Sequence, residues 1–248
     1  SQDLKHFKRG IDFLKSEKFS KALSSFKKFQ KENDGITVKF YIAACYMEME
    51  EYGEAKTRFI EIVNGYEGDK EVRWSMVNLG SCYHKLNQND SAIYYYSRAG
   101  EQYDAPEAYY NLAQLYYEME ELMKAKDQYD LAIENDSTNG RYYFMRQEIN
   151  FSLLDFEAAL KDMLLERKYE PQHYKAINEA YCHSMMENYA KADSIFMLIF
   201  DDKDPIFLNN YGFNKHKMGF SDEGIRFIQA SLQIKPDNSY AYRNLAMI

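Results

Sequence analysis

The stretch Tyr109-Tyr-Asn-Leu-Ala-Gln-Leu-Tyr-Tyr-Glu-Met-Glu-Glu-Leu-Met-Lys-Ala-Lys-Asp-Gln-Tyr-Asp-Leu-Ala132 decides the fold, because close variants of it recur along the chain. Large and small apolar residues fall at helical spacing in each half of it: Tyr109, Leu112, Ala113 and Tyr116, then Ala125, Tyr129 and Ala132. The polar run 118–121 interrupts this spacing. The stretch therefore predicts two helices joined by a short turn.

Each copy of the pattern is marked by a small residue that is followed twelve positions later by another. These pairs are Gly10/Ala22, Ala43/Ala55, Gly80/Ala92, Ala113/Ala125, Gln147/Ala159, Ala180/Ala192 and Gly212/Gly224, with Gln147 as the exception. A large apolar residue stands four positions after each second member: Phe26, Phe59, Tyr96, Tyr129, Met163, Phe196 and Ile228. Successive first members lie 32 to 37 residues apart, and a period near 34 predicts a solenoid of helical hairpins.

The small residues have a physical purpose, since two helices approach closely only where one of them lacks a bulky side chain. The large apolar residue nearby then fills the space above the small one. All four prolines lie between the predicted hairpins, where a missing N–H does the least harm: Pro106, Pro171, Pro205 and Pro236. The positions of the prolines thus agree with the register of the repeats.

These residues resemble the tetratricopeptide repeat family. The third copy supplies the family's Leu-Gly, Tyr, Ala and aromatic positions, at Leu79, Gly80, Tyr83, Ala92 and Tyr96. Pro171 and Pro236 stand at the family's closing position. The chain departs from the pattern at Gln147, at Asn150 and Lys215 in place of Tyr, and in a linker at 64–68 that is three residues longer.

The resemblance implies an all-α fold, a right-handed α-solenoid of stacked helix-turn-helix repeats. We expect one solenoid over residues 1–248. Its repeats are predicted at 3–35, 36–72, 73–105, 106–139, 140–172, 173–204 and 205–238, with a partial repeat at 239–248. In the partial repeat, Tyr242, Leu245 and Ala246 are expected to pack on the seventh hairpin. This leaves an apolar edge that offers a route to self-association.

Composition bounds the classes of function. No run of about 18 apolar residues occurs, so no membrane span is predicted. The net charge of −8, taken as spread over both signs, favours solubility and disfavours an RNA-binding helical-repeat protein, because nucleic acid requires a basic surface. The chain starts at Ser1, which leaves both a cytoplasmic and an exported or periplasmic location open.

No pattern in the sequence points to catalysis. Cys45, Cys82 and Cys182 occupy equivalent positions in different hairpins, about 10 Å or more apart, so we expect free thiols without a disulfide. Cys182 and His183 are neighbours on one helix and point about 100° apart. No phosphate loop, zinc-protease helix or hydrolase elbow is present. The sequence therefore predicts no metal, no cofactor and no enzyme activity.

A candidate binding face lies on the first helix of each hairpin, at positions three before, one after and four after the small residue. Asn recurs two positions before that residue, at Asn78, Asn111, Asn178, Asn210 and Asn244. In the family this face lines a concave groove, which implies binding of an extended peptide or a partner helix. The candidate groove residues are Asn78, Tyr110, Asn111, Gln114, Tyr117, Phe144, Glu148, Phe151, Asn178, Tyr181, Asn210 and Phe213.

Two interpretations of this face stay open: the side chains bind a ligand, or they pack between hairpins. Carboxamides can bond a peptide backbone without reading its side chains. We therefore expect a non-enzymatic protein interaction scaffold with a protein or peptide partner. The alternative is a sensory or regulatory part of a larger signalling or cell-envelope protein.

Overall fold

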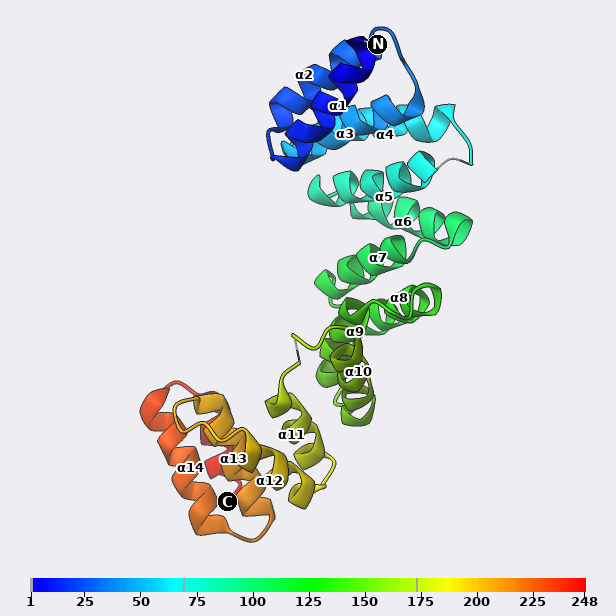
Figure 1. Cartoon of the computed structure of the whole chain (residues 1–248). Coiled ribbons are helices and arrows are strands. Elements are labelled where there is room, and N and C mark those ends of the chain that lie inside the picture. The colour runs from blue at the N-terminus through cyan, green and yellow to red at the C-terminus, as the bar shows by residue number, and fades with distance from the viewer. Residues whose placement is uncertain (1, 69, 173) are drawn as a thin grey trace. The chain divides into compact units, whose positions relative to one another are not determined.

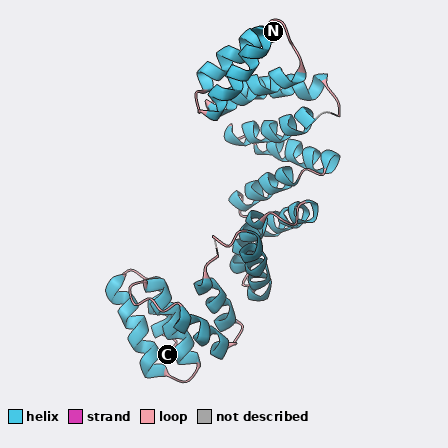
Figure 2. Cartoon of the chain, in the orientation of Figure 1, coloured by secondary structure: helices cyan, strands magenta, loops and turns pink. Residues whose placement is uncertain are grey.

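The computed structural model describes residues 2–68, 70–172 and 174–248, with side chains from Leu4 onward. Over these residues the chain forms fifteen α-helices and no strand (Figures 1 and 2). It divides into two compact units, Ser1–Ser137 and Thr138–Ile248, with the division between the fourth and fifth predicted repeats. The all-α fold class is confirmed, whereas the single solenoid over 1–248 stays a prediction.

The first unit consists of four helical hairpins, in which each helix contacts the next (Figure 1). Its helices are α1 (Gln2–Lys15), α2 (Phe19–Gln30), α3 (Ile36–Glu48), α4 (Tyr52–Gly65), α5 (Lys70–Lys85), α6 (Asn89–Tyr103), α7 (Pro106–Glu118) and α8 (Leu122–Asn135). The first helices of neighbouring hairpins also touch, α3 with α5 and α5 with α7. The third hairpin begins at Lys70 and not at the predicted residue 73, because α5 starts shortly after the linker at 64–68.

The second unit has three hairpins and a final short helix. Its helices are α9 (Gly140–Ser152), α10 (Phe156–Tyr169), α11 (Ala176–Met185), α12 (Tyr189–Leu198), α13 (Pro205–Lys217), α14 (Ser221–Ile234) and α15 (Ser239–Leu245). Pro106 and Pro205 occupy the first position of α7 and α13, where a helix needs no N–H from that residue.

The predicted small residues form the contact between the two helices of each hairpin. Ala22, Ala55, Ala125 and Ala192 are completely buried. A Cβ placed on Gly10 would lie 2.5 Å from the Phe26 ring, so the ring occupies the space that the missing side chain leaves. Such close approach is what the sequence pattern predicts, and its register is confirmed.

The turn inside each hairpin places one residue in the left-handed region at the same repeat position, seven residues after the small residue. These residues are Glu17, Glu50, Asn87, Glu120, Leu154, Glu187 and Gly219, with φ between 54° and 92°. Glycine adopts this region without a steric penalty, and Gly219 alone has it here. The shared conformation shows that the seven hairpins close by the same turn.

Leu154 is the turn residue least suited to this conformation, and replacing it with glycine is expected to stabilise the fold. It has φ 59° and is 71% exposed, so little packing is lost with its side chain. We expect Leu154→Gly to raise the free energy of unfolding by about 0.5–1 kcal/mol. Urea unfolding followed by circular dichroism measures this change. A lower stability would show that the exposed side chain contributes more than the turn strain costs.

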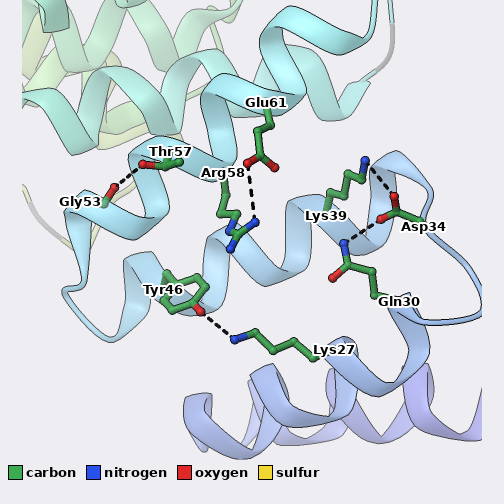
Figure 3. Close-up of polar contacts among 9 residues, drawn as sticks. All are labelled: Lys27, Gln30, Asp34, Lys39, Tyr46, Gly53, Thr57, Arg58 and Glu61. Carbon is green, nitrogen blue, oxygen red and sulfur yellow. Dashed lines mark hydrogen bonds and ion pairs between the residues drawn. The ribbon is translucent and has the colours of Figure 1, made fainter.

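Polar contacts fix the linker between the first two hairpins (Figure 3). Asp34 accepts a hydrogen bond of 2.7 Å from Gln30 and pairs with Lys39 at 3.2 Å. The bond from Gln30, followed by that from Lys39, lowers the pKa of Asp34. Lys27 of α2 donates to the hydroxyl of Tyr46 on α3 at 2.8 Å. The second hairpin is thus tied to the first through the C-terminal end of α2.

The packing predicted for the C-terminal partial repeat is wrong in its details. Tyr242 is 56% exposed and Ala246 is also exposed, while Leu245 is half-buried. The completely buried residue is Ala241, one position from Tyr242. The Asn238 side chain accepts a bond from the Ala241 N–H and donates to Ser231 at 3.0 Å, so this N-cap sets the rotation of α15.

Candidate functional site

The candidate face in the first unit is built on three first helices that are linked to each other by polar contacts. Thr37 of α3 donates to Glu71 of α5 at 2.9 Å. Two further pairs join α5 to α7 near their two ends: Arg73 with Glu107 at 3.3 Å, and His84 with Glu118 at 2.9 Å. These contacts fix the spacing of the helices before any ligand binds.

Between those two pairs, α5 and α7 carry free carboxamides. Asn78 and Asn111 are both half-buried, and neither side chain makes a hydrogen bond within residues 2–68, 70–172 and 174–248. Gln114 is likewise half-buried and without a side-chain bond to any described residue, and Tyr117 is 39% exposed. This arrangement places hydrogen-bond donors and acceptors at a fixed spacing, which suits the backbone of an extended peptide ligand.

Tyr110 occupies a different environment from its predicted neighbours. It is only 7% exposed, and its ring lies 5.8 Å from the ring of Tyr129 on α8. The ring therefore packs inside the hairpin formed by α7 and α8. For this residue the structure favours the packing interpretation over the ligand interpretation.

The predicted residues of the second unit divide between packing and exposure. Phe151 and Tyr181 have ring centroids 6.3 Å apart, and both contact Phe156 of α10. These rings join α9, α10 and α11. Phe144, Glu148, Asn178 and Phe213 are half-buried, and the cation of Lys217 lies 5.4 Å from the Phe213 ring.

The asparagines that recur two positions before the small residue have two roles in the second unit. The Asn178 side chain makes no hydrogen bond to another described residue, as in the first unit. Asn244 of α15 instead donates to Asn209 at 3.0 Å, and Asn209 donates to Asn210 at 3.2 Å. The amides of Asn210 and Asn244 therefore help to hold α15 on α13.

A buried polar cluster lies where the sequence departs from the repeat pattern. Arg146 forms two bonds to the carboxylate of Asp162, at 2.9 and 2.5 Å, and Asn150 donates to the same carboxylate at 2.9 Å. Asp162 is 1% exposed. Lys215, the other replacement of the expected Tyr, pairs with Asp193 at 2.7 Å. An acidic residue on the facing helix was the signal that could have revealed both pairs.

The Cys182-His183 pair has none of the properties of a catalytic thiolate and base. Both residues are buried, and burial raises the pKa of the Cys182 thiol to about 12. Burial, followed by the Lys191 charge, lowers the pKa of His183. Cys45 and Cys82 are also buried, and the three thiols are free, as predicted.

Two other features are absent from the residues that the structure describes. That part of the chain contains no group of three or more His, Cys, Asp or Glu residues able to hold a metal ion. Within it, no helix is both long enough and apolar enough to cross a membrane. The half-buried carboxamide face on α5 and α7 is thus the candidate site that the repeat pattern and the geometry share.

Comparison with known proteins gives matches to repeat families and to solved structures. Two models of the tetratricopeptide repeat match residues 36–105 and 106–139. A comparison with curated proteins found no match. The solved C-terminal part of a TPR repeat-containing protein from Cytophaga hutchinsonii is 16% identical, with a TM-score of 0.71 over 96% of this chain and 99% of that one.

Two further solved structures are similar. YrrB, described as a TPR protein with an unusual peptide-binding site, is 18% identical, with a TM-score of 0.65 over 76% of this chain and 97% of its own. A tetratricopeptide repeat protein from Parabacteroides merdae is 14% identical, with a TM-score of 0.56 over 100% of this chain and 99% of that one. Residues 36–139 are therefore tetratricopeptide repeats, and the chain has the fold of solved tetratricopeptide repeat proteins.

Proposed function

We propose that this chain is a non-enzymatic scaffold that binds an extended peptide segment along the first helices of its repeats. The observation that carries the proposal is the pair Asn78 and Asn111, which are half-buried at equivalent repeat positions on touching helices and have no partner among the described side chains. A half-buried amide without a partner gains from a ligand that supplies one.

The proposed contact surface in the first unit consists of Asn78, Asn111, Gln114 and Tyr117, which we call the amide face. Peptide backbone groups would bond the three carboxamides, and an apolar side chain of the ligand would lie on the Tyr117 ring. The polar pairs that join α5 to α7 hold this face in place, so little ordering of the receptor opposes binding. In the second unit Asn178 and Phe144 are the corresponding candidates.

The description of YrrB as a TPR protein with a peptide-binding site supports this class of ligand. The alternative is that the chain is a regulatory part of a larger protein. It would bind its partner through the same kind of contact, but further domains would be attached to it in the same polypeptide. The non-enzymatic part of the proposal is supported by the cysteines: all three are buried with raised pKa values, which does not suit nucleophilic catalysis by a thiolate.

The proposal is tested with the double variant Asn78→Ala and Asn111→Ala. A ligand is first selected from a random peptide library displayed on phage, and its affinity is then measured by calorimetry. We expect the variant to bind about tenfold or more weakly, because two desolvated hydrogen bonds are lost, while its melting temperature stays nearly unchanged.

The matched control is Asn33→Ala with Asn64→Ala, since both residues are exposed and their side chains make no bond to the rest of the described chain. Its affinity should equal that of the parent. Equal binding by both double variants would remove the amide face from the proposed mechanism. A large drop in melting temperature for the first variant would assign these amides to the fold.

A further inference from the structure

One position of the first helix carries a side chain with a charged partner in six of the seven hairpins. It lies three residues after the small residue, or after Gln147 where that residue replaces it. In four hairpins the side chain is an aromatic ring with a cation within 5.3 Å of its centroid: Phe13, Tyr46, Tyr83 and Tyr116. In two others Asn150 donates to Asp162 at 2.9 Å, and Lys215 pairs with Asp193 at 2.7 Å.

The sixth hairpin, formed by α11 and α12, has His183 at this position (Figure 1). His183 is 4% exposed, and neither of its ring nitrogens makes a hydrogen bond to a described residue. Its Nε2 atom lies 4.0 Å from Oε1 of Glu179, one turn earlier on α11. The other oxygen of that carboxylate accepts a bond from Tyr174 and lies 3.8 Å from Arg167. The imidazole is therefore buried without the bonds that usually stabilise a buried polar group.

A lysine charge acts on this imidazole where another hairpin places a lysine over a tyrosine ring. Lys124 and Lys191 both stand eleven positions after the small residue of their hairpins. The Nζ atom of Lys124 lies 5.3 Å from the centroid of the Tyr116 ring. Burial lowers the pKa of His183, and the charge of Lys191 lowers it further. A tyrosine ring attracts a cation, whereas a protonated imidazole repels one.

The other charged groups around His183 do not offset these two effects. Glu179 favours the protonated imidazole, but burial and Lys191 have the larger influence on its pKa. Arg167 of α10 brings a positive charge to the same carboxylate. Asp193 of α12 is paired with a lysine of α13. The closed hairpin therefore favours the neutral form of His183.

The sixth hairpin also has the shortest helices of the seven. α11 and α12 have 10 residues each, whereas the helices of the other six hairpins have 12 to 16. A shorter helix has fewer backbone bonds and less buried surface to lose when it opens. A change of charge inside this hairpin thus acts on a locally weak part of the stack.

We propose that the hairpin of α11 and α12 is an acid-sensitive switch, which opens when His183 is protonated while the hairpins of the first unit stay closed. α11 carries Asn178 and Tyr181, so the opening disrupts the candidate face of the second unit and leaves the amide face in place. The inference concerns the folding of one hairpin and does not depend on peptide binding.

The direction of the pH dependence follows from the two states of the imidazole. In the open hairpin His183 is solvated and has its ordinary pKa of 6.5, and in the closed hairpin its pKa is lower. The closed hairpin is therefore fully stable above pH 6.5 and loses stability as the pH falls from 6.5 through the lowered pKa. At about pH 5.5, protonation favours the open hairpin by at most about tenfold.

The test is hydrogen exchange of the full chain at about pH 7.5 and 5.5, resolved along the sequence by proteolysis and mass spectrometry. Protection factors, which correct for the pH dependence of intrinsic exchange, are compared for residues 176–198 and 106–135. We expect protection of 176–198 to fall about threefold or more at the lower pH, and that of 106–135 to change by less than about twofold. Unchanged protection of 176–198, or an equal fall in both segments, would overturn the proposal.

Two variants assign the response to His183. His183→Tyr restores the residue that three other hairpins have at this position, and His183→Gln supplies an uncharged side chain in case the larger ring does not fit. Both should abolish the acid response of 176–198. The matched control is His6→Gln, which removes a half-buried imidazole from the first hairpin and should keep the full response. A response that persists in both His183 variants would overturn the proposal, because other groups would then cause the opening.

Discussion

Gly80→Ala is expected to lower the free energy of unfolding by about 1–3 kcal/mol, although the same change stabilises most helices. A Cβ at this position would lie 2.6 Å from two atoms of the Tyr96 ring. The ring cannot move cheaply, because Tyr96 is 2% exposed and its hydroxyl donates to Ser81 at 2.9 Å. The added methyl group must therefore push α5 and α6 apart.

Gly53→Ala is the matched control within the same unit. Gly53 lies in α4, and nothing would come within 4 Å of a Cβ added there. Its carbonyl accepts a bond from Thr57, which alanine leaves intact (Figure 3). We expect this variant to gain up to about 1 kcal/mol, the usual advantage of alanine over glycine inside a helix.

Urea unfolding of both variants, followed by circular dichroism, shows whether the steric contact with Tyr96 or the helix propensity of alanine determines the effect at Gly80. Opposite signs for the two changes would confirm that Gly80 is a spacer. If Gly80→Ala stabilises the chain as much as Gly53→Ala does, the close contact between α5 and Tyr96 is not a determinant of stability.

The fold was predictable because each repeat obeys one local rule. The small residues such as Ala125 and the ring four positions later, such as Tyr129, both appear in the sequence at fixed spacing, and both are completely buried. Since every hairpin contacts mainly its neighbours, correct local pairing is enough to predict the stack of hairpins. The first helices of the third and sixth hairpins start away from the predicted repeat starts at 73 and 173, α5 at Lys70 and α11 at Ala176.

The candidate site was less predictable, because repeat position alone does not specify how a side chain is used. Asn78 and Asn210 stand at the same repeat position, yet Asn78 is free of partners among the described residues and Asn210 is bonded to Asn209. Tyr110 and Tyr117 were both predicted to lie on the binding face of α7, yet Tyr110 is 7% exposed and Tyr117 is 39% exposed. Such differences depend on rotamers and on neighbours in space, which a one-dimensional pattern does not contain.

The basic character of residues 1–31, nine Lys and Arg against three Asp and Glu, was missed for another reason. Charge was averaged over 248 residues, whereas the charge of a surface belongs to the elements that form it. Lys5 and Arg9 stand at the repeat positions that Val38 and Ile42 occupy in the next copy, and this difference is present in the sequence itself. In a repeat protein, a departure from the repeat is as informative as agreement with it.

The buried cluster around Asp162 is such a departure, and Asp162→Leu is expected to have the largest effect on stability, about 3–5 kcal/mol. The carboxylate accepts two bonds from Arg146 and one from Asn150. The Arg146 side chain is 17% exposed and Asn150 is 1% exposed, so water replaces few of the lost bonds. The guanidinium of Arg146 and the amide of Asn150 would lose the carboxylate that accepts these bonds.

The compensating variant replaces the three polar residues together, with Arg146→Met, Asn150→Leu and Asp162→Leu. No charge or amide of the cluster then remains unpaired, and buried ion pairs are often replaced by apolar residues at little cost. We expect its stability to lie within about 1–2 kcal/mol of the parent. The positions are coupled through the shared carboxylate, so the effects should be far from additive.

The two variants are compared with the parent by urea unfolding, followed by circular dichroism. A loss of less than about 1 kcal/mol for Asp162→Leu would show that the cluster is solvated and energetically minor. A triple variant as unstable as Asp162→Leu alone would show that α9 and α10 need polar contacts for their register. Recovery in the triple variant would show instead that the hairpin tolerates either solution: an apolar contact as in the other repeats, or a carboxylate that accepts bonds from both Arg146 and Asn150.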